Sequence, residues 1–228
     1  MPPLGSDTAF TSPYTRNTVG GNALTRIKRA IDDVIHTPSH NQQQKLFASS
    51  IMDSMVLVDV SIGSMAEEPS RLEGKVVIQI VVNEGPSSAK LLTSGACPNR
   101  VRCIDMLNLA NTVHGGCLAY FVDFCSSMAL VALDLHNSDD YAVSVSQALN
   151  VVFHSPAALR VHRLCVICSL PDSISPRSGE TIRIVNTSVS SGGRSATGRT
   201  EIWNENHKRI MASGTHIKMM PSNPKTKL

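Results

Sequence analysis

Residues 114–135 read HGGCLAYFVDFCSSMALVALDL, and this stretch decides the fold of the chain. After the two glycines, Val122, Ala129 and Leu133 recur with helical spacing in an apolar stretch of about five turns. A helix that is apolar on nearly all sides must be buried. Antiparallel strands wrapped around it would supply that burial, so the sequence predicts an α+β fold built on one long central helix.

Segments with the pattern of β-strands lie on both sides of this helix. Residues 54–64 and Lys75–Asn83 are rich in Val and Ile, and the polar turn between them predicts that they pair as antiparallel neighbours. The strands expected after the helix are Tyr141–Phe153, Thr181–Ser191, Arg199–Trp203 and Arg209–Met220. We therefore expect an antiparallel sheet of five to six strands.

The N-terminal part of the chain has a different pattern. Residues 1–20 mix Pro, Gly, Ser and Thr without apolar periodicity, which predicts a flexible tail. Residues 21–52 are expected to form a helical extension, because Leu24, Ile27 and Ile31 lie on one face of a helix and a second helical piece is expected at 42–52. The main domain then covers residues 53–221, with inserts near 84–103 and 158–178, and a C-terminal tail at 222–228.

Composition excludes some classes of protein. The 228 residues include 21 basic and 18 acidic ones, spread along the chain without the Lys/Arg blocks of nucleic-acid-binding proteins. Aromatic residues make up only 4%, which argues against a stacking surface for single-stranded nucleic acid. No run approaches the ~20 apolar residues that span a bilayer, so we expect an intracellular soluble protein.

The cysteines indicate whether the protein binds a metal, and the last three residues indicate where in the cell it is located. The chain has six cysteines, and Cys165 and Cys168 form a lone CxxC that lacks the four ligands of a structural zinc site. Reduced thiols and no metal are therefore expected. The ending Thr226-Lys227-Leu228 approximates the peroxisomal Ser-Lys-Leu signal, which predicts a peroxisomal protein if the ending is read and a cytoplasmic one if it is not. A mitochondrial location is a third alternative.

His114, Gly115 and Gly116 stand at the start of the expected central helix. Backbone N–H groups there have no partner within the helix, and the positive end of the helix dipole points the same way. Such groups can hold a carbonyl oxygen as it becomes negative, and glycine lets a substrate come close. The alternative is that the two glycines only form a tight entry turn.

Asp123 is the second candidate, because it lies in the apolar sequence Tyr120-Phe121-Val122-Asp123-Phe124-Cys125. An ionised carboxylate in such a setting is costly unless it has a partner or a task. Burial would raise its pKa toward the range of a general base. The alternative is a structural carboxylate hydrogen-bonded to a neighbouring strand.

Gly116 and Asp123 are too far apart to act on one carbonyl carbon. Seven residues separate them, which is about 10 Å along a helix. Two such helices lying antiparallel across a two-fold axis would bring the start of each one near the Asp123 of the other. The chemistry thus predicts a homodimer with two equivalent sites.

The spacing of these residues resembles a known family. Asn108 stands six residues before His114, Asp123 nine residues after it, and Ser127-Met128-Ala129-Leu130 follows. This pattern resembles the hotdog-fold acyl-CoA thioesterases, in the phenylacetate-pathway or 4-hydroxybenzoyl-CoA thioesterase-like branch. The resemblance continues through Val143-Ser144-Val145 and Ser155-Pro156-Ala157. It implies a hotdog fold and hydrolysis of an acyl-CoA thioester to free acid and coenzyme A, with no cofactor besides the substrate's own coenzyme A.

The resemblance also implies roles for individual residues. The Gly115 N–H and the Asn108 amide would polarise the thioester carbonyl, and Asp123 of the other subunit would attack it or activate water. Ser144 would orient that water, and His114 would shape the site through hydrogen bonds. The alternative for His114 is that it only caps the helix start. The residues expected to contact the substrate, mostly through the nucleotide of coenzyme A, are Gly116, Arg194, Ser195, His216 and Lys218.

Alternatives stay open on function and assembly. The chain could bind acyl-CoA without catalysis, as a sensor or scaffold. A hydratase is the third option, but the Asp and His pair that hotdog hydratases place near a helix start is not seen here. Asn111 departs from the glycine usual at that position, and the two inserts leave the acyl chain open. A homodimer that pairs further into a dimer of dimers is the expected assembly.

Overall fold

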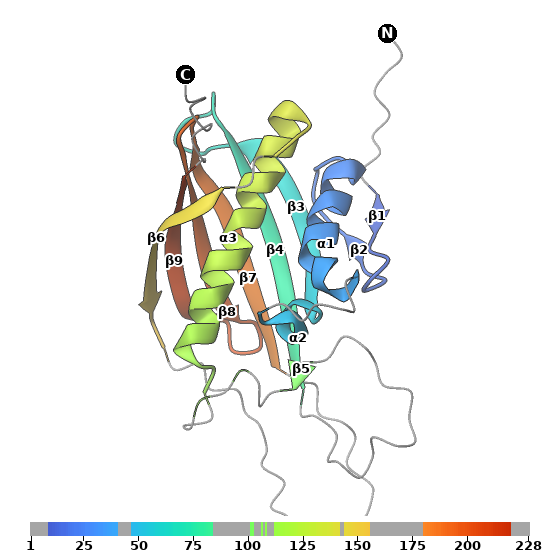
Figure 1. Ribbon diagram of the computed structural model, residues 1–228, viewed down its shortest axis with the longest axis vertical. Helices are drawn as coiled ribbons and strands as arrows, with labels where there is room; N and C mark the ends of the chain where they lie inside the picture. Colours follow the sequence, from blue (N-terminus) through green and yellow to red (C-terminus); the bar gives the residue numbers. More distant parts are fainter. Residues whose placement is uncertain are drawn as a thin grey trace, which may run out of the picture.

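The computed structural model describes residues 9–40, 47–83, 101–102, 106, 108, 112–141, 144–155 and 180–219 (Figure 1). Its helices are α1 (Thr25–His40), α2 (Ser49–Met52) and α3 (Gly115–Ser138). Its strands are β1 (Phe10–Thr11), β2 (Thr18–Val19), β3 (Met55–Ser64), β4 (Leu72–Asn83), β5 (Val101–Arg102), β6 (Val145–Phe153), β7 (Glu180–Ser191), β8 (Ser195–Asn204) and β9 (Arg209–Met219).

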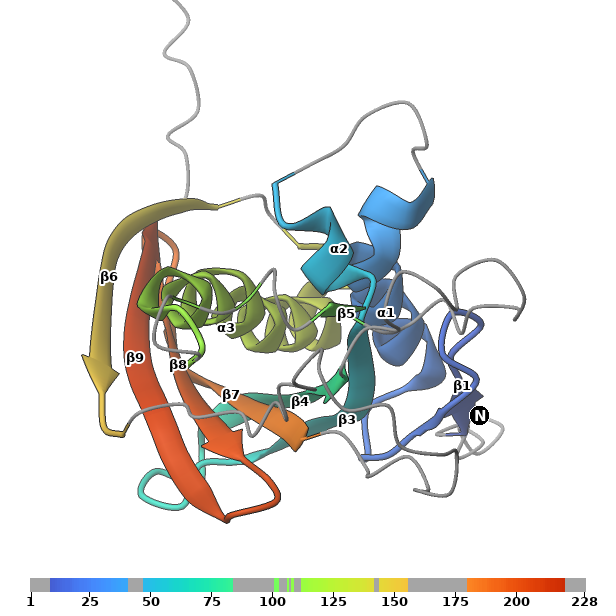
Figure 2. The same ribbon diagram turned by 90° about the horizontal axis from the view of Figure 1, so that it is seen from below.

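One sheet holds all the long strands. Its order is β3-β4-β7-β8-β9-β6, every neighbouring pair in this order is antiparallel, and the short β5 runs parallel to the end of β4. Figure 2 shows the sheet curling around α3, with β6 at one edge and β3 at the other. The expected α+β architecture, with strands wrapped around one long helix, is confirmed.

The central helix lies directly on the backbone of the sheet. A Cβ atom added to Gly74 on β4 would lie 2.4 Å from the carbonyl oxygen of Ala129. On β8, a Cβ at Gly198 would lie 3.0 Å from the carbonyl oxygen of Ser126. Glycine at these positions therefore removes side chains that would push α3 away from the sheet.

The close packing of α3 against the sheet explains why this helix is so apolar. Among the described residues, α3 is the one helix long and apolar enough to cross a membrane, with a mean hydropathy of 1.7. More than half of that apolar window, 56%, is buried inside the protein. Phe121, Val122, Cys125 and Ala129 have no exposed surface. The apolar sequence is accounted for by the core around this helix.

The N-terminal extension packs beside β3 and α3. Ile27, Ile31 and Ile35 are fully buried, which confirms an amphipathic first helix. The second helical piece is shorter than expected, because Ala48 adopts a left-handed φ of 56° and α2 begins after it. Residues 41–46 lie outside the described residues.

The flexible tail expected at residues 1–20 is wrong for its second half. β1 and β2 pair there as a short hairpin, and Phe10 and Val19 are buried. Gly20 then joins the edge of β3, donating its N–H to the carbonyl of Val58 at 2.8 Å and accepting from the N–H of Val60 at 3.2 Å. Strands of two residues are too short to produce a periodic sequence pattern, which is why the hairpin was missed.

Most strand boundaries agree with the expectation, and the differences have local causes. β8 starts at Ser195, four residues before the expected Arg199, because the segment Ser195-Ala196-Thr197-Gly198 lacks large apolar side chains yet pairs with β7 and β9. The insert near 84–103 is described only at β5. The insert near 158–178 and the C-terminal tail at 222–228 lie outside the described residues.

Candidate active site

The start of α3 has the geometry expected for holding a carbonyl. His114 caps the helix with an extended backbone, and its Nδ1 accepts a hydrogen bond from the Gly116 N–H at 2.9 Å. The N–H of Gly116 is therefore engaged by the cap. Gly115, the first helical residue, occupies a position whose N–H has no carbonyl partner within the helix.

Asn108 is anchored beside this helix start. Its side-chain amide donates to Thr112 Oγ1 at 2.8 Å, and its Oδ1 accepts from the Thr112 N–H at 3.1 Å. A pocket of about 310 Å³ opens here, lined by Thr112, Val113, Gly115, Leu118, Phe153, His154 and Ser155. The structure thus brings Asn108, His114 and Gly115 together at the N-terminal end of α3.

Asp123 lies about two turns further along α3. Its side chain is 48% exposed, so the buried carboxylate expected from the sequence is wrong for the single chain. The reason is that Asp123 lies at the margin of the sheet, beside the edge strand β6, and the sheet does not close over it. The apolar neighbours in the sequence belong to other faces of the helix, such as Phe121 and Val122 in the core.

A serine and a histidine from the sheet meet Asp123. Ser146 on β6 donates its hydroxyl to Asp123 Oδ1 at 3.0 Å, and His216 Nε2 on β9 lies 3.4 Å from the same oxygen. Ser144 was the serine expected to orient water, and it lies just before β6. The hydroxyl that contacts Asp123 is that of Ser146, two residues later. Both serines share one face of an extended chain, and sequence alone does not say which one stands beside the helix.

His216 and Lys218 lie on the inner side of the sheet and not on an open surface. His216 is fully buried, and its Nδ1 lies 2.8 Å from Ser126 Oγ. Burial lowers the pKa of His216, the nearby Lys218 lowers it further, and the charge of Asp123 acts in the opposite direction. His216 has no exposed surface in the single chain, and its expected contact with coenzyme A stays a prediction.

Lys218 belongs to the same polar group. Its Nζ donates to Ser127 Oγ at 2.9 Å, on the turn of α3 that follows Asp123. Burial lowers the pKa of Lys218, and the charge of Asp123 raises it. The lysine therefore places a half-buried cation near the carboxylate, whereas a contact with coenzyme A stays a prediction.

Arg194 lies in the exposed turn between β7 and β8, and Ser195 is the exposed first residue of β8. Ser195 pairs with Met219 at the end of β9, next to Lys218, so this turn lies at the Asp123 end of the sheet. Their predicted contact with coenzyme A stays a prediction. Among the described residues, no three His, Cys, Asp or Glu side chains gather where they could hold a metal ion.

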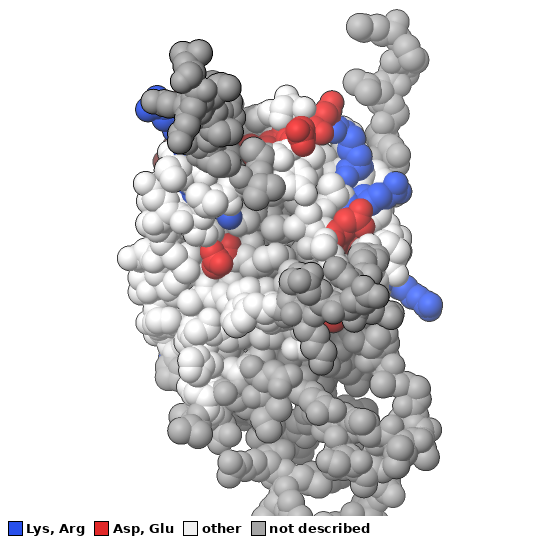
Figure 3. Space-filling view, in the orientation of Figure 1, with Lys and Arg blue, Asp and Glu red and all other residues white. Residues whose placement is uncertain are grey.

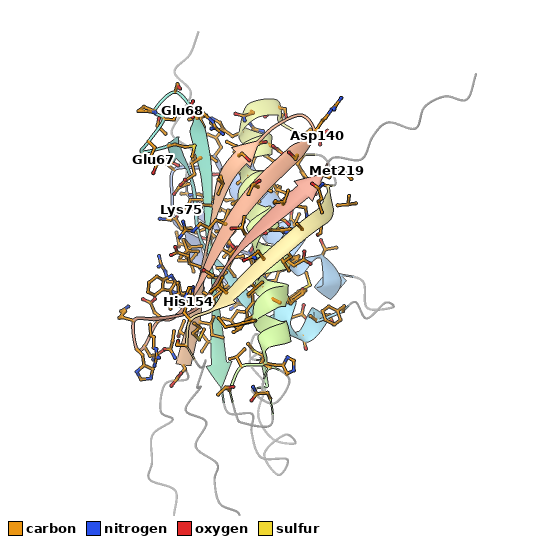
Figure 4. The ribbon with its side chains drawn as sticks, turned by 90° about the vertical axis from the view of Figure 1, so that its left-hand side faces the viewer. Glu67, Glu68, Lys75, Asp140, His154 and Met219 are labelled. Atoms are coloured by element: carbon orange, nitrogen blue, oxygen red, sulfur yellow. The ribbon has the colours of Figure 1, made fainter. Side chains whose placement is uncertain are left out.

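The two halves of the candidate site lie at opposite ends of β6. A Cβ added to Gly115 would lie 3.4 Å from the ring of Phe153 at the end of β6, whereas Asp123 contacts Ser146 at its start. In Figure 4, His154 marks the first end and Met219, the partner of Val145, marks the second. Eight residues of helix, or about 12 Å, separate Gly115 from Asp123. One chain therefore presents two half-sites.

Comparisons with known proteins address the fold. No protein-family model matches the chain, and no curated protein does. Among solved structures, zebrafish thioesterase superfamily member 2 aligns with a TM-score of 0.50 and 19% identity, over 86% of this chain and 94% of that one. The chain has the hotdog fold. The mouse protein of the same name aligns with a TM-score of 0.48 and 19% identity, over 86% and 96% of the two chains.

The hotdog domain is also similar to the PaaI protein of E. coli from the phenylacetic acid degradation operon. That alignment has a TM-score of 0.47 and 13% identity, and it covers 82% of this chain and 92% of that one. At such identities the likeness establishes the fold and not the reaction. The chemistry has to be argued from the half-sites themselves.

Proposed function

We propose that this hotdog protein is an acyl-CoA thioesterase that hydrolyses an acyl-CoA thioester to the free acid and coenzyme A. The observation that carries the proposal is the pair of half-sites, a helix start where the Gly115 N–H has no carbonyl partner within the helix and a carboxylate at Asp123 held by Ser146. Solved hotdog structures that carry the name thioesterase superfamily member 2 support this reaction class.

The reaction needs both half-sites. The thioester oxygen would accept hydrogen bonds from the Gly115 N–H and the Asn108 amide, where the positive end of the helix dipole stabilises the developing negative charge. Asp123 would take a proton from a water molecule, whose oxygen then attacks the carbonyl carbon. Collapse of the tetrahedral intermediate breaks the C–S bond, and the proton passes to the departing thiolate.

A dimer through β6 would join the half-sites. Within the part of the chain that the structure describes, β6 is an edge strand without a strand partner on one side, and its Val145, Leu149, Val152 and Phe153 are 40% to 56% exposed. A two-fold axis through the middle of β6 places the Ser146 end of one strand beside the Phe153 end of the other. Gly115 of one chain then approaches Asp123 of the second chain.

The charge distribution favours the same surface. Figure 3 shows few charged side chains over β6 and the neighbouring part of α3, while Lys, Arg, Asp and Glu gather over α1. A second copy would also cover the half-exposed Asp123, which gives the carboxylate the dry surroundings that a general base uses. We include this homodimer in the proposal.

Thiol release from a panel of short, medium, long and aromatic acyl-CoAs tests the function. Wild-type protein should release coenzyme A from at least one of them, and Asp123→Asn should remove at least about 10²-fold of kcat. Asp134→Asn is the matched control, because Asp134 lies on the same helix and bonds to Ser191 instead. Binding of acyl-CoA without any thiol release would contradict the proposal and favour a sensor.

A further inference from the structure

A row of hydrogen-bonding groups leads from the core to Asp123. Ser126 Oγ on α3 lies 2.8 Å from His216 Nδ1, and His216 Nε2 lies 2.9 Å from Ser146 Oγ. Ser146 in turn donates to Asp123 Oδ1 at 3.0 Å. The row begins on α3, passes through β9 and β6 and returns to α3. Its inner members, Ser126 and His216, are fully buried.

The positions of the protons in this row can be worked out from its outer end. An ionised carboxylate only accepts hydrogen bonds, so the single hydroxyl proton of Ser146 points to Asp123. The contact between Ser146 and His216 then requires a proton on His216 Nε2. The 3.4 Å separation of Nε2 from Asp123 Oδ1 agrees, because the same N–H faces the carboxylate.

The inner end of the row determines whether the second ring nitrogen of His216, Nδ1, carries a proton. Burial and the neighbouring Lys218 lower the pKa of His216 and outweigh the charge and the backbone carbonyl of Asp123, which raise it, so a neutral ring is favoured. With its proton on Nε2, the neutral ring has a bare Nδ1 that accepts a hydrogen bond. Ser126 supplies this bond from its hydroxyl at 2.8 Å, whereas the other acceptor within reach of this hydroxyl, the backbone carbonyl oxygen of Asp123, lies farther away at 3.4 Å. Every hydrogen bond in the row therefore points toward Asp123.

Resting on the proposed thioesterase reaction, we infer that Ser126 and His216 are positioning residues that fix the direction of the Ser146 hydroxyl. His216 donates to the oxygen of Ser146, so the hydroxyl proton is left for Asp123 Oδ1. That oxygen is thereby occupied, and Oδ2 becomes the carboxylate oxygen that takes up a water molecule. If Ser146 rotated, its proton would leave Asp123 and the carboxylate would lose its fixed orientation.

A purely structural role for Ser126 and His216 makes a different prediction. In that case the two residues only satisfy each other inside the core, and any side chain that fills the space would serve. The directional row requires a donor at the place of Nε2. His216→Gln can place an amide N–H there, whereas His216→Phe fills similar space without a donor.

The tautomer of His216 tests the inference without any activity. Nitrogen NMR of ¹⁵N-histidine-labelled protein at pH 7.5 should find Nε2 protonated and Nδ1 unprotonated, with the signals assigned by their absence from His216→Gln. Ser126→Ala should weaken this preference. A proton on Nδ1, in either a neutral or a doubly protonated ring, overturns the inference. This result stands whether or not the protein hydrolyses thioesters.

Steady-state kinetics of His216 and Ser126 variants test the effect of the two positioning residues on the reaction. His216→Phe should lower kcat by about 10²-fold with KM nearly unchanged, because a misplaced catalytic group costs about that much. His216→Gln should retain most of kcat, and Ser126→Ala should lose roughly tenfold. Circular dichroism and sedimentation verify that each variant is folded and assembled like the wild type.

Failure of the proposed thioesterase function and failure of the positioning role would give different results. A wild-type protein that turns over no acyl-CoA contradicts the proposed function, and the nitrogen spectra still decide the direction of the row. Equal activities of His216→Gln and His216→Phe, in a wild type that is active, overturn the positioning role alone.

Discussion

Ser146 at the start of the edge strand β6 donates its hydroxyl proton to Asp123 Oδ1 of the central helix at 3.0 Å. This bond ties the carboxylate to the sheet on the side where a second copy of the chain would approach. It also makes Ser146, and not Ser144, the serine in contact with the candidate base.

Replacing Ser146 by Ala should slow the reaction without unfolding the protein. A hydrogen bond to a charged group contributes about 2 kcal/mol, which corresponds to roughly thirtyfold in kcat. Ser144→Ala is the matched control, since it removes a hydroxyl from the same segment two residues earlier. Steady-state kinetics on one acyl-CoA would compare the two variants. A larger loss for Ser144→Ala would show that the assignment of Ser146 is wrong.

Gly115→Pro should remove the carbonyl-binding N–H while leaving the helix intact. Proline is tolerated at the first helical position, and it favours an extended residue before it, which His114 already is with φ −60° and ψ 133°. Loss of one such donor lowers kcat by about 10²- to 10³-fold. Gly115→Ala adds the same Cβ atom, keeps the N–H and should stay active. A variant with proline that turns over at the wild-type rate would exclude Gly115 as the donor.

Mixed dimers should recover activity from two inactive chains. When Asp123→Asn and Gly115→Pro chains exchange subunits, half of the dimers contain one of each, and each of these has one intact site. The mixture should reach about a quarter of the wild-type activity. Thiol release is measured before and after exchange, with each variant alone as the control. An unchanged, near-zero rate would mean that both groups act within one chain.

Gly74→Ala should destabilise the fold because β4 touches the backbone of α3 there. The new Cβ would lie 2.4 Å from the Ala129 carbonyl oxygen, so the helix has to shift. Overpacking of this kind costs about 1–3 kcal/mol. Gly63→Ala is the control, since a Cβ there has nothing within 4 Å. Urea denaturation followed by circular dichroism should show a lower midpoint for Gly74→Ala only.

The sequence predicted the central helix, the long strands and the residues at the two ends of the candidate site, but it missed the β1–β2 hairpin. The apolar stretch after Gly116 predicted α3, and Asp123 within it pointed to the carboxylate. These inferences depend on residues close together in the chain, where helical and strand periodicities are visible. The prediction of a second chain rests on the same kind of local reasoning, because the rise of a helix fixes the distance between Gly116 and Asp123, and it stays a prediction.

The partners of Asp123 could not be obtained in the same way. Whether Ser144 or Ser146 meets the helix depends on the register of β6 against β9, which shifts at an irregularity between Ser146 and Ala148. One signal was present but not used, since Ser126 is a polar residue on the buried side of α3, and a buried hydroxyl requires a partner.

The N-terminal extension contains a histidine that sequence patterns did not reveal. His36 on α1 is buried, its Nδ1 lies 2.9 Å from the carbonyl oxygen of Asp32, and its Nε2 lies 3.2 Å from that of Met55 on β3. The Asp32 carboxylate is fully buried too, and it accepts the Ser12 hydroxyl at 2.6 Å. Both ring nitrogens face carbonyl oxygens, which only accept hydrogen bonds, so this geometry favours the doubly protonated ring, whose charge would compensate that of the Asp32 carboxylate.

Raising the pH should therefore loosen the extension from β3. Burial lowers the pKa of His36, but its hydrogen bonds and the charge of Asp32 outweigh burial and raise the pKa above the ordinary value. Because the pKa of His36 is higher in the folded than in the unfolded protein, protonation of His36 stabilises the folded state fully below about pH 6.5. This stabilisation is lost as the pH rises through the pKa of the folded protein. Burial and Asp33 raise the pKa of the neighbouring Tyr14 to about 12, so the tyrosine stays neutral throughout this range.

Hydrogen exchange of residues 9–40 at pH 6 and pH 9, corrected for the intrinsic rate, measures the effect. Protection in the wild type should fall at pH 9, whereas Asp32→Asn should lose the dependence, since it removes the charge that raises the pKa of His36. Lys28, whose pKa is lowered by burial, also lies on α1, and comparison of the two proteins at each pH separates its contribution. His207→Gln changes an exposed histidine and should behave as the wild type does. Equal protection of the wild type at both pH values would show that His36 is neutral in the folded protein.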